Sequence, residues 1–158
     1  MILTGVSLLV VALDQTTKFL ILHSIPLGQS RVIFPNYLYF TFNQNSGIAF
    51  GFMANMDAAI RVPFFITITV TAAFMVYYCQ RLIPEGNLTA RVALGLIWGG
   101  ALGNLVDRLL YGKVVDFIDV RYADFQWYIF NAADSFITVG LIYLFVDFGL
   151  KNIQKKTL

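Results

Sequence analysis

Cysteine and histidine are almost missing from this sequence of 158 residues, which contains only Cys79 and His23. A single cysteine excludes an internal disulfide, and one cysteine with one histidine cannot supply the ligands of a zinc site. His23 lies outside every polar cluster, which disfavours Ser-His-Asp and Cys-His catalysis. Any metal would have to be held by carboxylates alone, so we expect neither a metal site nor a cofactor.

Charged residues are also scarce, at 13% of the chain against roughly 25% in soluble domains. Hydrophobic residues make up 58%, and this composition indicates an integral membrane protein with a single domain, residues 1–158. The net charge of +2 comes without a basic stripe, so we expect membrane lipids and no nucleic acid as partners.

Four segments are long and apolar enough to cross a bilayer, which takes about 20 residues. They predict an all-α membrane protein with four transmembrane helices and a small extracytoplasmic β-element between helices 1 and 2. The first segment carries Asp14 and Lys18 and lacks a basic start, so we interpret it as a retained helix rather than a secretory signal. The predicted helices are residues 1–22, 62–78, 90–110 and 132–148.

The distribution of basic residues predicts the orientation of the chain. Basic residues are densest in two short pieces around 81–91 and 151–156, which favours cytoplasmic N- and C-termini. Residues 31–53 are rich in aromatic and β-branched side chains around the turn cluster NQNSG, which predicts a strand, a tight turn and a second short strand. An open sheet edge cannot face hydrocarbon, so this β-cradle is expected at the membrane surface. Residues 111–131 are expected to form a shorter outer loop.

Polar residues gather between Gly99 and Phe136, within an otherwise apolar chain. A charged carboxylate in or beside lipid is unfavourable in free energy. Such residues therefore occur mainly where they form an ion pair, line a water-filled cavity or take part in a reaction. Asp116 stands among apolar neighbours, whereas Asp119 and Asp124 can be read as solvated loop charges. The 17 residues from Asp134 to Lys151 rise about 25 Å, which puts Asp134 near the outer boundary of a bilayer whose core is about 30 Å thick.

Several of these residues also have a purely structural interpretation. Asp14 and Lys18 are four apart and can form an ion pair within one helix. Asn104, Asp107 and Arg108 share a helix face, where Asp107 and Arg108 could lock the helix end. Asn131 and Asp134 have the spacing of a capping box, so the pattern alone leaves capping and catalysis both open.

Two carboxylates held together at a membrane boundary have a recognisable chemical use. Both cannot ionise easily, so one pKa rises and the pair shares a proton. One member can then take a proton from water while the other donates one to a carbonyl oxygen. This chemistry hydrolyses a peptide bond without a covalent intermediate or a metal.

Five blocks of this chain resemble the lipoprotein signal peptidases, also called signal peptidase II, a family of bacterial membrane aspartyl peptidases. The resemblance covers nearly the whole chain, in order and at family-like spacing. The blocks are DQTTK at 14–18, NQNSGIAF at 43–50, GGALGNLVDR at 99–108, VVDFI at 114–118 and FNAADS at 130–135.

The resemblance implies an endopeptidase that cleaves a prolipoprotein just before a cysteine carrying diacylglycerol. It implies a catalytic pair, Asp116 and Asp134, and site-supporting residues Asp14, Lys18 and Asp107. Asp107 is a rival for a place in the pair, but its neighbour Arg108 would keep it ionised. The resemblance also implies that substrate is held by Asn45, Gly47, Asn104, Arg108 and Asn131.

The same resemblance implies a place in the bacterial cytoplasmic (inner) membrane, with the active site near its outer face. We expect a monomer whose β-cradle holds the lipid-modified prolipoprotein by main-chain hydrogen bonds. Two alternatives remain open: a proton-coupled transporter that uses the aspartates as a relay, and an assembly protein whose polar residues join helices.

Overall fold

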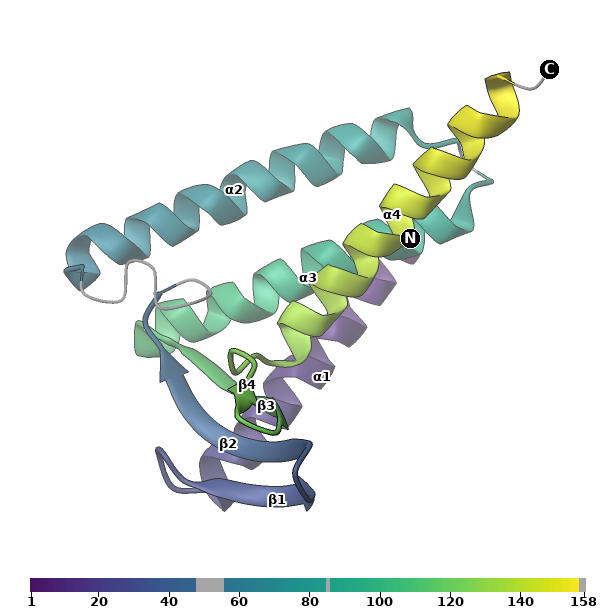
Figure 1. The fold of residues 1–158 in the computed structure, drawn as a ribbon. Coiled ribbons are helices and arrows are strands. Elements are labelled where there is room, and N and C mark those ends of the chain that lie inside the picture. The colour runs from purple at the N-terminus through teal and green to yellow at the C-terminus, as the bar shows by residue number, and fades with distance from the viewer. Residues whose placement is uncertain (48–55, 85, 157–158) are drawn as a thin grey trace.

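The structure, a computed structural model, describes residues 1–47, 56–84 and 86–156, with side chains beyond Phe148 left out. Its elements follow the order α1, β1, β2, α2, α3, β3, β4 and α4 (Figure 1). The helices are α1 Ile2–Ser24, α2 Ala58–Leu82, α3 Leu88–Tyr111 and α4 Ala132–Lys156. The strands are β1 Ser30–Phe34, β2 Leu38–Asn45, β3 Val114–Tyr122 and β4 Phe125–Gln126.

Helix α3 is the centre of the helical part, because α1, α2 and α4 all pack against it. Its ends are set by local chemistry. The side chain of Asn87 accepts a hydrogen bond from the backbone N–H of Ala90 (3.2 Å), and Gly112 ends the helix in a left-handed conformation (φ 68°). Helix α2 begins in the same way at Asp57, whose carboxylate accepts from the N–H of Ala59 (2.9 Å).

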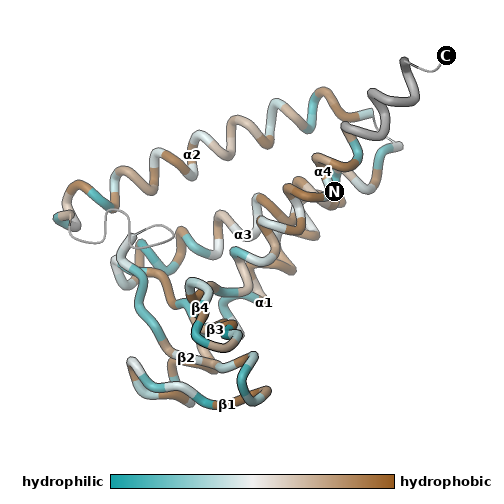
Figure 2. Tube along the Cα trace, in the orientation of Figure 1, coloured by the Kyte–Doolittle hydropathy of each residue, from teal (hydrophilic) through white to brown (hydrophobic). Residues whose placement is uncertain are grey.

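Hydrophobic residues recur along the helices, whereas hydrophilic ones are frequent along β1 and β2 (Figure 2). Among the described helices, α1, α2 and α3 are long and apolar enough to cross a membrane by length and composition. Helix α4 is not among these three and carries Asp134 in its first turn. Its crossing of the membrane therefore stays a prediction.

The strands form one antiparallel sheet in the order β1-β2-β3-β4. The expected β-element between helices 1 and 2 is thus only half of the sheet, and the prediction that residues 111–131 form a loop is wrong. The run from Val114 to Tyr122 is rich in β-branched residues, and it pairs with β2 so that Asp116 stands opposite Asn43.

The predicted turn cluster NQNSG begins inside β2, which extends to Asn45. The chain turns earlier, at Asn36, whose φ of 66° joins β1 to β2. The second strand expected after NQNSG falls on residues 48–53, outside the described part of the chain.

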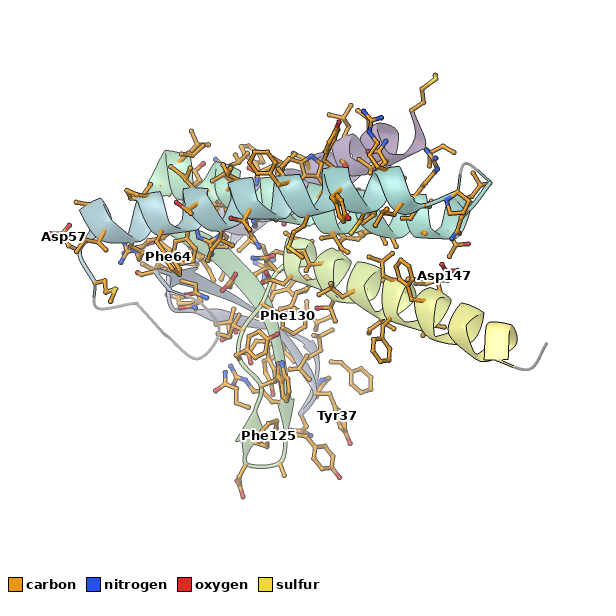
Figure 3. The ribbon with its side chains drawn as sticks, turned by 90° about the horizontal axis from the view of Figure 1, so that it is seen from above. Tyr37, Asp57, Phe64, Phe125, Phe130 and Asp147 are labelled. Carbon is orange, nitrogen blue, oxygen red and sulfur yellow. The ribbon has the colours of Figure 1, made fainter. Side chains whose placement is uncertain are left out.

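A buried apolar cluster attaches the sheet to the end of α1. Ile21 and Ile25 of this end pack with Phe42 of β2 and with Val115 and Phe117 of β3. The far end of the sheet projects away from the helices, as the positions of Tyr37 and Phe125 show (Figure 3). The cluster therefore fixes Asp116, which lies between Val115 and Phe117, against the end of the helical part.

Candidate active site

Asp116 is held in place by two asparagines from other parts of the chain. Its side chain is only 2% exposed. One carboxylate oxygen accepts a hydrogen bond from Nδ2 of Asn131 (2.6 Å), and the other accepts from Nδ2 of Asn45 (2.9 Å). The β2–β3 register and the start of α4 therefore fix the orientation of this carboxyl group.

Asp134 lies in the first turn of α4 and forms the capping box that its spacing predicts. Its backbone N–H donates to Oδ1 of Asn131 (3.0 Å), and its Oδ2 accepts from the backbone N–H of Asn131 (3.3 Å). Its Oδ1 accepts from Nδ2 of Asn104 (2.8 Å). Capping thus does not remove Asp134 from the site, because the same carboxyl group also faces a cavity that it shares with Asp116.

This cavity has a volume of about 200 Å³, room for several water molecules at about 30 Å³ each. Its lining brings together both predicted catalytic residues and four of the five predicted substrate-binding residues. The fifth, Asn131, is fully buried and joins Asp116, Asp134 and Asn104 from behind. The lining residues are Asn45, Gly47, Asn104, Arg108, Val114, Asp116, Tyr128, Ile129, Asp134, Ile137 and Thr138.

Burial, and after it the nearby charge of Asp134, raise the pKa of Asp116 to about 7. The hydrogen bonds from Asn45 and Asn131 favour the ionised form and limit the rise. A carboxyl group with this pKa exchanges a proton near neutral pH. This is the behaviour predicted for one member of a proton-sharing pair.

Arg108 and Asp107 turn to different partners at the end of α3, and their role in fixing that helix end stays a prediction. Its guanidinium lies 3.9 Å from the ring centroid of Phe65 on α2, and its Nη1 donates to the carbonyl oxygen of Asn104 (3.3 Å). Successive residues of a helix point about 100° apart, so Asp107 turns inward while Arg108 reaches the cavity. Arg108 is the cationic side chain in the described cavity lining.

The partner of Asp107 is Lys18, which connects three of the predicted supporting residues in the interior. The Nζ of Lys18 lies 2.8 Å from Asp14 Oδ2 and 2.9 Å from Asp107 Oδ2, which confirms the predicted Asp14–Lys18 ion pair. Lys18 also donates to Oδ1 of Asn104 (3.0 Å). None of the three charged residues lines the cavity, but Lys18 reaches it through Asn104 and through its charge, which lowers the pKa of Asp116.

The two buried carboxylates also connect the helices to the elements that carry Asp116 and Asp134. Asp14 accepts from the backbone N–H of Ala133 at the start of α4 (2.9 Å), and Asp107 accepts from the N–H of Val115 at the start of β3 (2.9 Å). Each supporting carboxylate therefore holds the residue directly before a predicted catalytic aspartate.

Sequence reasoning missed Gln15, Tyr128, Ile129, Ile137 and Thr138. Gln15 donates to Oδ1 of Asp107 (2.9 Å) and to the carbonyl oxygen of Gly103 (3.1 Å). It stands beside Asp14, so polarity within an apolar helix could have found it. The aromatic and aliphatic lining residues carry no such signal, because apolar side chains are common throughout the chain.

Asp119 is a second correction. It is fully buried rather than a solvated loop charge, and it accepts hydrogen bonds from Thr41 (2.7 Å), Gln126 (2.9 Å) and Arg121. Burial acts to raise the pKa of Asp119, but these donors outweigh it and the pKa lies below its usual range. Asp119 joins β2, β3 and β4 and takes no part in the cavity.

Within the described ranges, no group of three or more His, Cys, Asp or Glu side chains is placed to hold a metal ion. The polar groups of the described cavity lining are two carboxyl groups, two side-chain amides, one guanidinium and the hydroxyls of Tyr128 and Thr138.

Comparison with known proteins agrees with this arrangement. A family model described as signal peptidase (SPase) II matches residues 6–150. The lipoprotein signal peptidase of Syntrophotalea carbinolica is 42% identical over 141 residues, covering 89% of this chain and 86% of that protein. The lipoprotein signal peptidase of Bacillus subtilis is 40% identical over 152 residues, covering 96% of this chain and 95% of that protein.

A solved structure described as a bacterial membrane enzyme superposes with a TM-score of 0.80 at 35% identity, covering 96% of this chain and 88% of that chain. The similarity therefore extends over sequence, fold and nearly the full length. The predicted resemblance is confirmed, and the chain belongs to the signal peptidase II family of lipoprotein signal peptidases.

Proposed function

We propose that this peptidase removes the signal peptide from diacylglyceryl-modified prolipoproteins, just before the lipidated cysteine, as an aspartyl endopeptidase. Membership of the signal peptidase II family supports the removal of signal peptides from prolipoproteins. The observation that carries the aspartyl mechanism is that Asp116 and Asp134, from β3 and α4, line one cavity.

In the proposed reaction the pair shares one proton and holds a water molecule between its carboxyl groups. The ionised carboxylate takes a proton from the water while the water oxygen attacks the scissile carbonyl carbon. The protonated carboxyl group donates its proton to the carbonyl oxygen. As the resulting tetrahedral diol collapses, one of its hydroxyl groups returns a proton to the ionised carboxylate, the C–N bond breaks, and the amine nitrogen takes a proton from the other carboxyl group. One water is consumed and the pair recovers its single proton.

The remaining polar residues have distinct roles in this proposal. Asn45 and Asn131 orient Asp116, and Asn104 orients Asp134, so both carboxyl groups are positioned before substrate arrives. Arg108 and Gly47 line the cavity and meet the substrate backbone in this proposal. Asp14, Lys18 and Asp107 support the site from the interior.

The transporter alternative receives less support from the geometry. A proton relay needs acids that can each take up and release a proton along a path. Asp14 and Asp107 are instead buried against the same ammonium group of Lys18. Their contacts fit a structural role better than a relay.

We further propose that all four helices cross the cytoplasmic (inner) membrane, with both termini in the cytoplasm and the cavity near the outer face. Three helices are long and apolar enough for this. Helix α4 packs along α3 from Ala133 to Asp147, which supports a shared path through the bilayer. We propose that the enzyme acts as a monomer.

Cleavage of a lipidated precursor by purified variants in detergent tests the proposal. Asp116→Asn and Asp134→Asn are each expected to lower the rate at least about 100-fold, because each removes one proton-transferring group. Asp124→Asn, in the exposed turn between β3 and β4, is the matched control and should cleave at the wild-type rate. A folded Asp116→Asn or Asp134→Asn protein with wild-type activity would overturn the mechanism, and equal cleavage of an unlipidated precursor would overturn the substrate assignment.

A further inference from the structure

A second polar cavity lies at the end of the helices opposite the sheet. It has a volume of about 430 Å³ and is formed where α2 ends and α3 begins. Two arginines line it, one from each helix, and none of its described lining residues is acidic. The lining residues are Tyr77, Gln80, Arg81, Ile83 and Arg91.

The two arginines of the cavity differ in burial and in their contacts. The Nε atom of Arg91 is buried and has no hydrogen-bond partner among the described residues. Arg81 is exposed and donates through Nη2 to the hydroxyl of Tyr77 (2.8 Å), with its guanidinium 5.0 Å from the centroid of that ring. A buried N–H without an acceptor is costly, and guanidinium groups pair well with phosphate oxygens.

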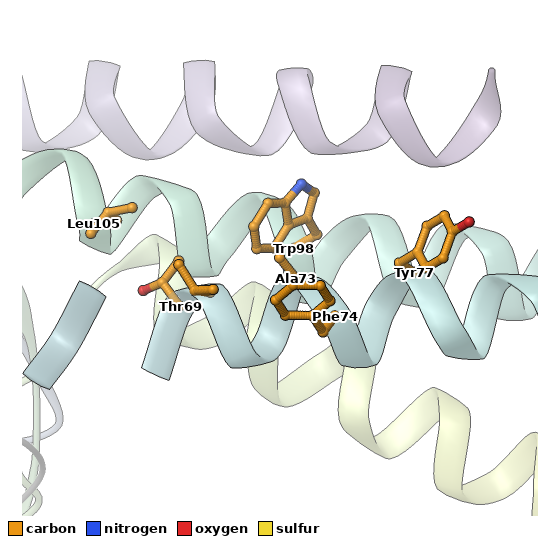
Figure 4. Close-up of a pocket in the computed structure, with 7 residues that line it drawn as sticks. Thr69, Ala73, Phe74, Tyr77, Trp98 and Leu105 are labelled. Carbon is orange, nitrogen blue, oxygen red and sulfur yellow. The ribbon is translucent and has the colours of Figure 1, made fainter. Parts of the chain in front are cut away.

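An apolar groove of about 490 Å³ begins at the same tyrosine. It runs between α2 and α3 from Tyr77, past Phe74 and Trp98, to Thr69 and Leu105 (Figure 4). Tyr77 lines both the groove and the basic cavity. From Arg81 to Thr69 the helix rises about 18 Å, close to the roughly 15 Å depth of one leaflet of hydrocarbon.

We propose that the basic cavity and the apolar groove together bind one anionic phospholipid, with its phosphate between Arg81 and Arg91 and an acyl chain along the groove. The charge of the cavity matches the headgroup, and the length of the groove matches a chain from the same leaflet. Basic cavities between membrane helices are suited to such headgroups. In the proposed orientation this lipid belongs to the cytoplasmic leaflet, and it would strengthen the attachment of α2 to α3.

Thermal unfolding of the full chain in detergent tests this proposal. Short-chain phosphatidylglycerol, short-chain phosphatidylcholine and inorganic phosphate are added separately. Phosphatidylglycerol at a hundredfold excess over its Kd is expected to raise Tm by about 5 °C or more, and the other two are expected to raise it far less. An equal rise in Tm with inorganic phosphate would identify a free anion as the ligand rather than a lipid. An equal rise with phosphatidylcholine would show that the arginines do not select the headgroup. Either result overturns the proposal.

Variants separate the two halves of the site, each measured against its own lipid-free Tm. Arg81→Gln with Arg91→Gln should abolish the preference for phosphatidylglycerol over phosphatidylcholine. Ala73→Trp fills the groove. This variant should need at least ten times more phosphatidylglycerol than the wild type for the same rise in Tm. Arg31→Gln, exposed on β1, is the control and should respond as wild type. An unchanged preference in either the single Arg91→Gln variant or the double variant would overturn the proposal.

Discussion

At the scale of single residues, protonation of the Asp116 carboxyl group is coupled to folding. Its pKa rises from 3.8 to about 7 when the chain folds, so the folded protein binds this proton more tightly than the unfolded chain does. The stability that comes from the bound proton is complete below about pH 4 and is lost as the pH rises through 7.

We predict that Asp116→Asn reduces the fall in folding stability that the wild type shows as the pH rises. A shift of about three pKa units corresponds to at most about 4 kcal/mol of unfolding free energy. Wild-type Tm in detergent should fall between pH 4 and pH 8 by more than the Tm of the variant. Asp124→Asn removes the same formal charge in an exposed turn and should keep the wild-type dependence. Parallel curves for wild type and Asp116→Asn would contradict the raised pKa.

The hydrogen bond from Asn45 offers a test of the shared proton. This bond lowers the pKa of Asp116, so Asn45→Ala should raise it and move the alkaline limb of the cleavage profile to higher pH. Gln126→Ala, which changes a contact of Asp119 on the same sheet, is the control and should leave the limb in place. The measurement is the normalised rate from pH 5 to pH 10, and an alkaline limb that moves to lower pH would contradict the assignment.

At the scale of elements, close packing of α3 against α4 places Asp134. A Cβ atom on Gly100 would lie 2.5 Å from the carbonyl oxygen of Ala133 and 2.7 Å from Cγ1 of Ile137. The nearer atom is backbone, so the start of α4 would have to move, and the carboxyl group of Asp134 would move with it.

We therefore predict that Gly100→Ala lowers both Tm and cleavage, the latter at least tenfold, although the residue lies outside the cavity lining. Gly5→Ala is the matched control, because nothing lies within 4 Å of its added Cβ. Alanine is the better helix former by about 1 kcal/mol, so Gly5→Ala should be neutral or stabilising. Wild-type cleavage by Gly100→Ala would show that the position of α4 tolerates such a shift.

The helices could be predicted from sequence, but the sheet could be predicted only in part. Apolar runs of about 20 residues are a strong local signal, and the helices lie within a few residues of the predicted ranges at most ends. Strand β3 was hidden because its pairing with β2 joins segments about 75 residues apart, and a strand buried on both faces lacks a regular alternation.

In the candidate site, too, local motifs could be predicted and contacts between distant segments could not. Motif resemblance named Asp116, Asp134 and four other residues of the cavity lining, whereas the partner of Asp107 could not be read from neighbouring positions. Lys18 lies about 90 residues away in the chain and reaches Asp107 only through the packing of α1 on α3. Contacts that depend on such packing have no signature in a single sequence.

At the scale of the whole molecule, the proposed orientation predicts which loops face which side. Cys79 is the one cysteine of the chain, so Cys79→Ser provides a background for single cysteines. Asp124→Cys should react with a membrane-impermeant maleimide in intact spheroplasts, and Gly86→Cys should react only after permeabilisation. A reporter fused after α4 should also be cytoplasmic; an outside reporter would show that α4 does not cross the bilayer.

The reciprocal cap between Asn131 and Asp134 has a consequence for biosynthesis. Because the same two side chains begin α4 and reach the cavity, the proposed mechanism requires that α4 is wound and docked before the aspartate pair is complete. A chain still emerging from the ribosome carries Asp116 but no completed partner for it. In the proposed mechanism a nascent chain that lacks a docked α4 is therefore inactive, and hydrolysis begins only once this helix is in place.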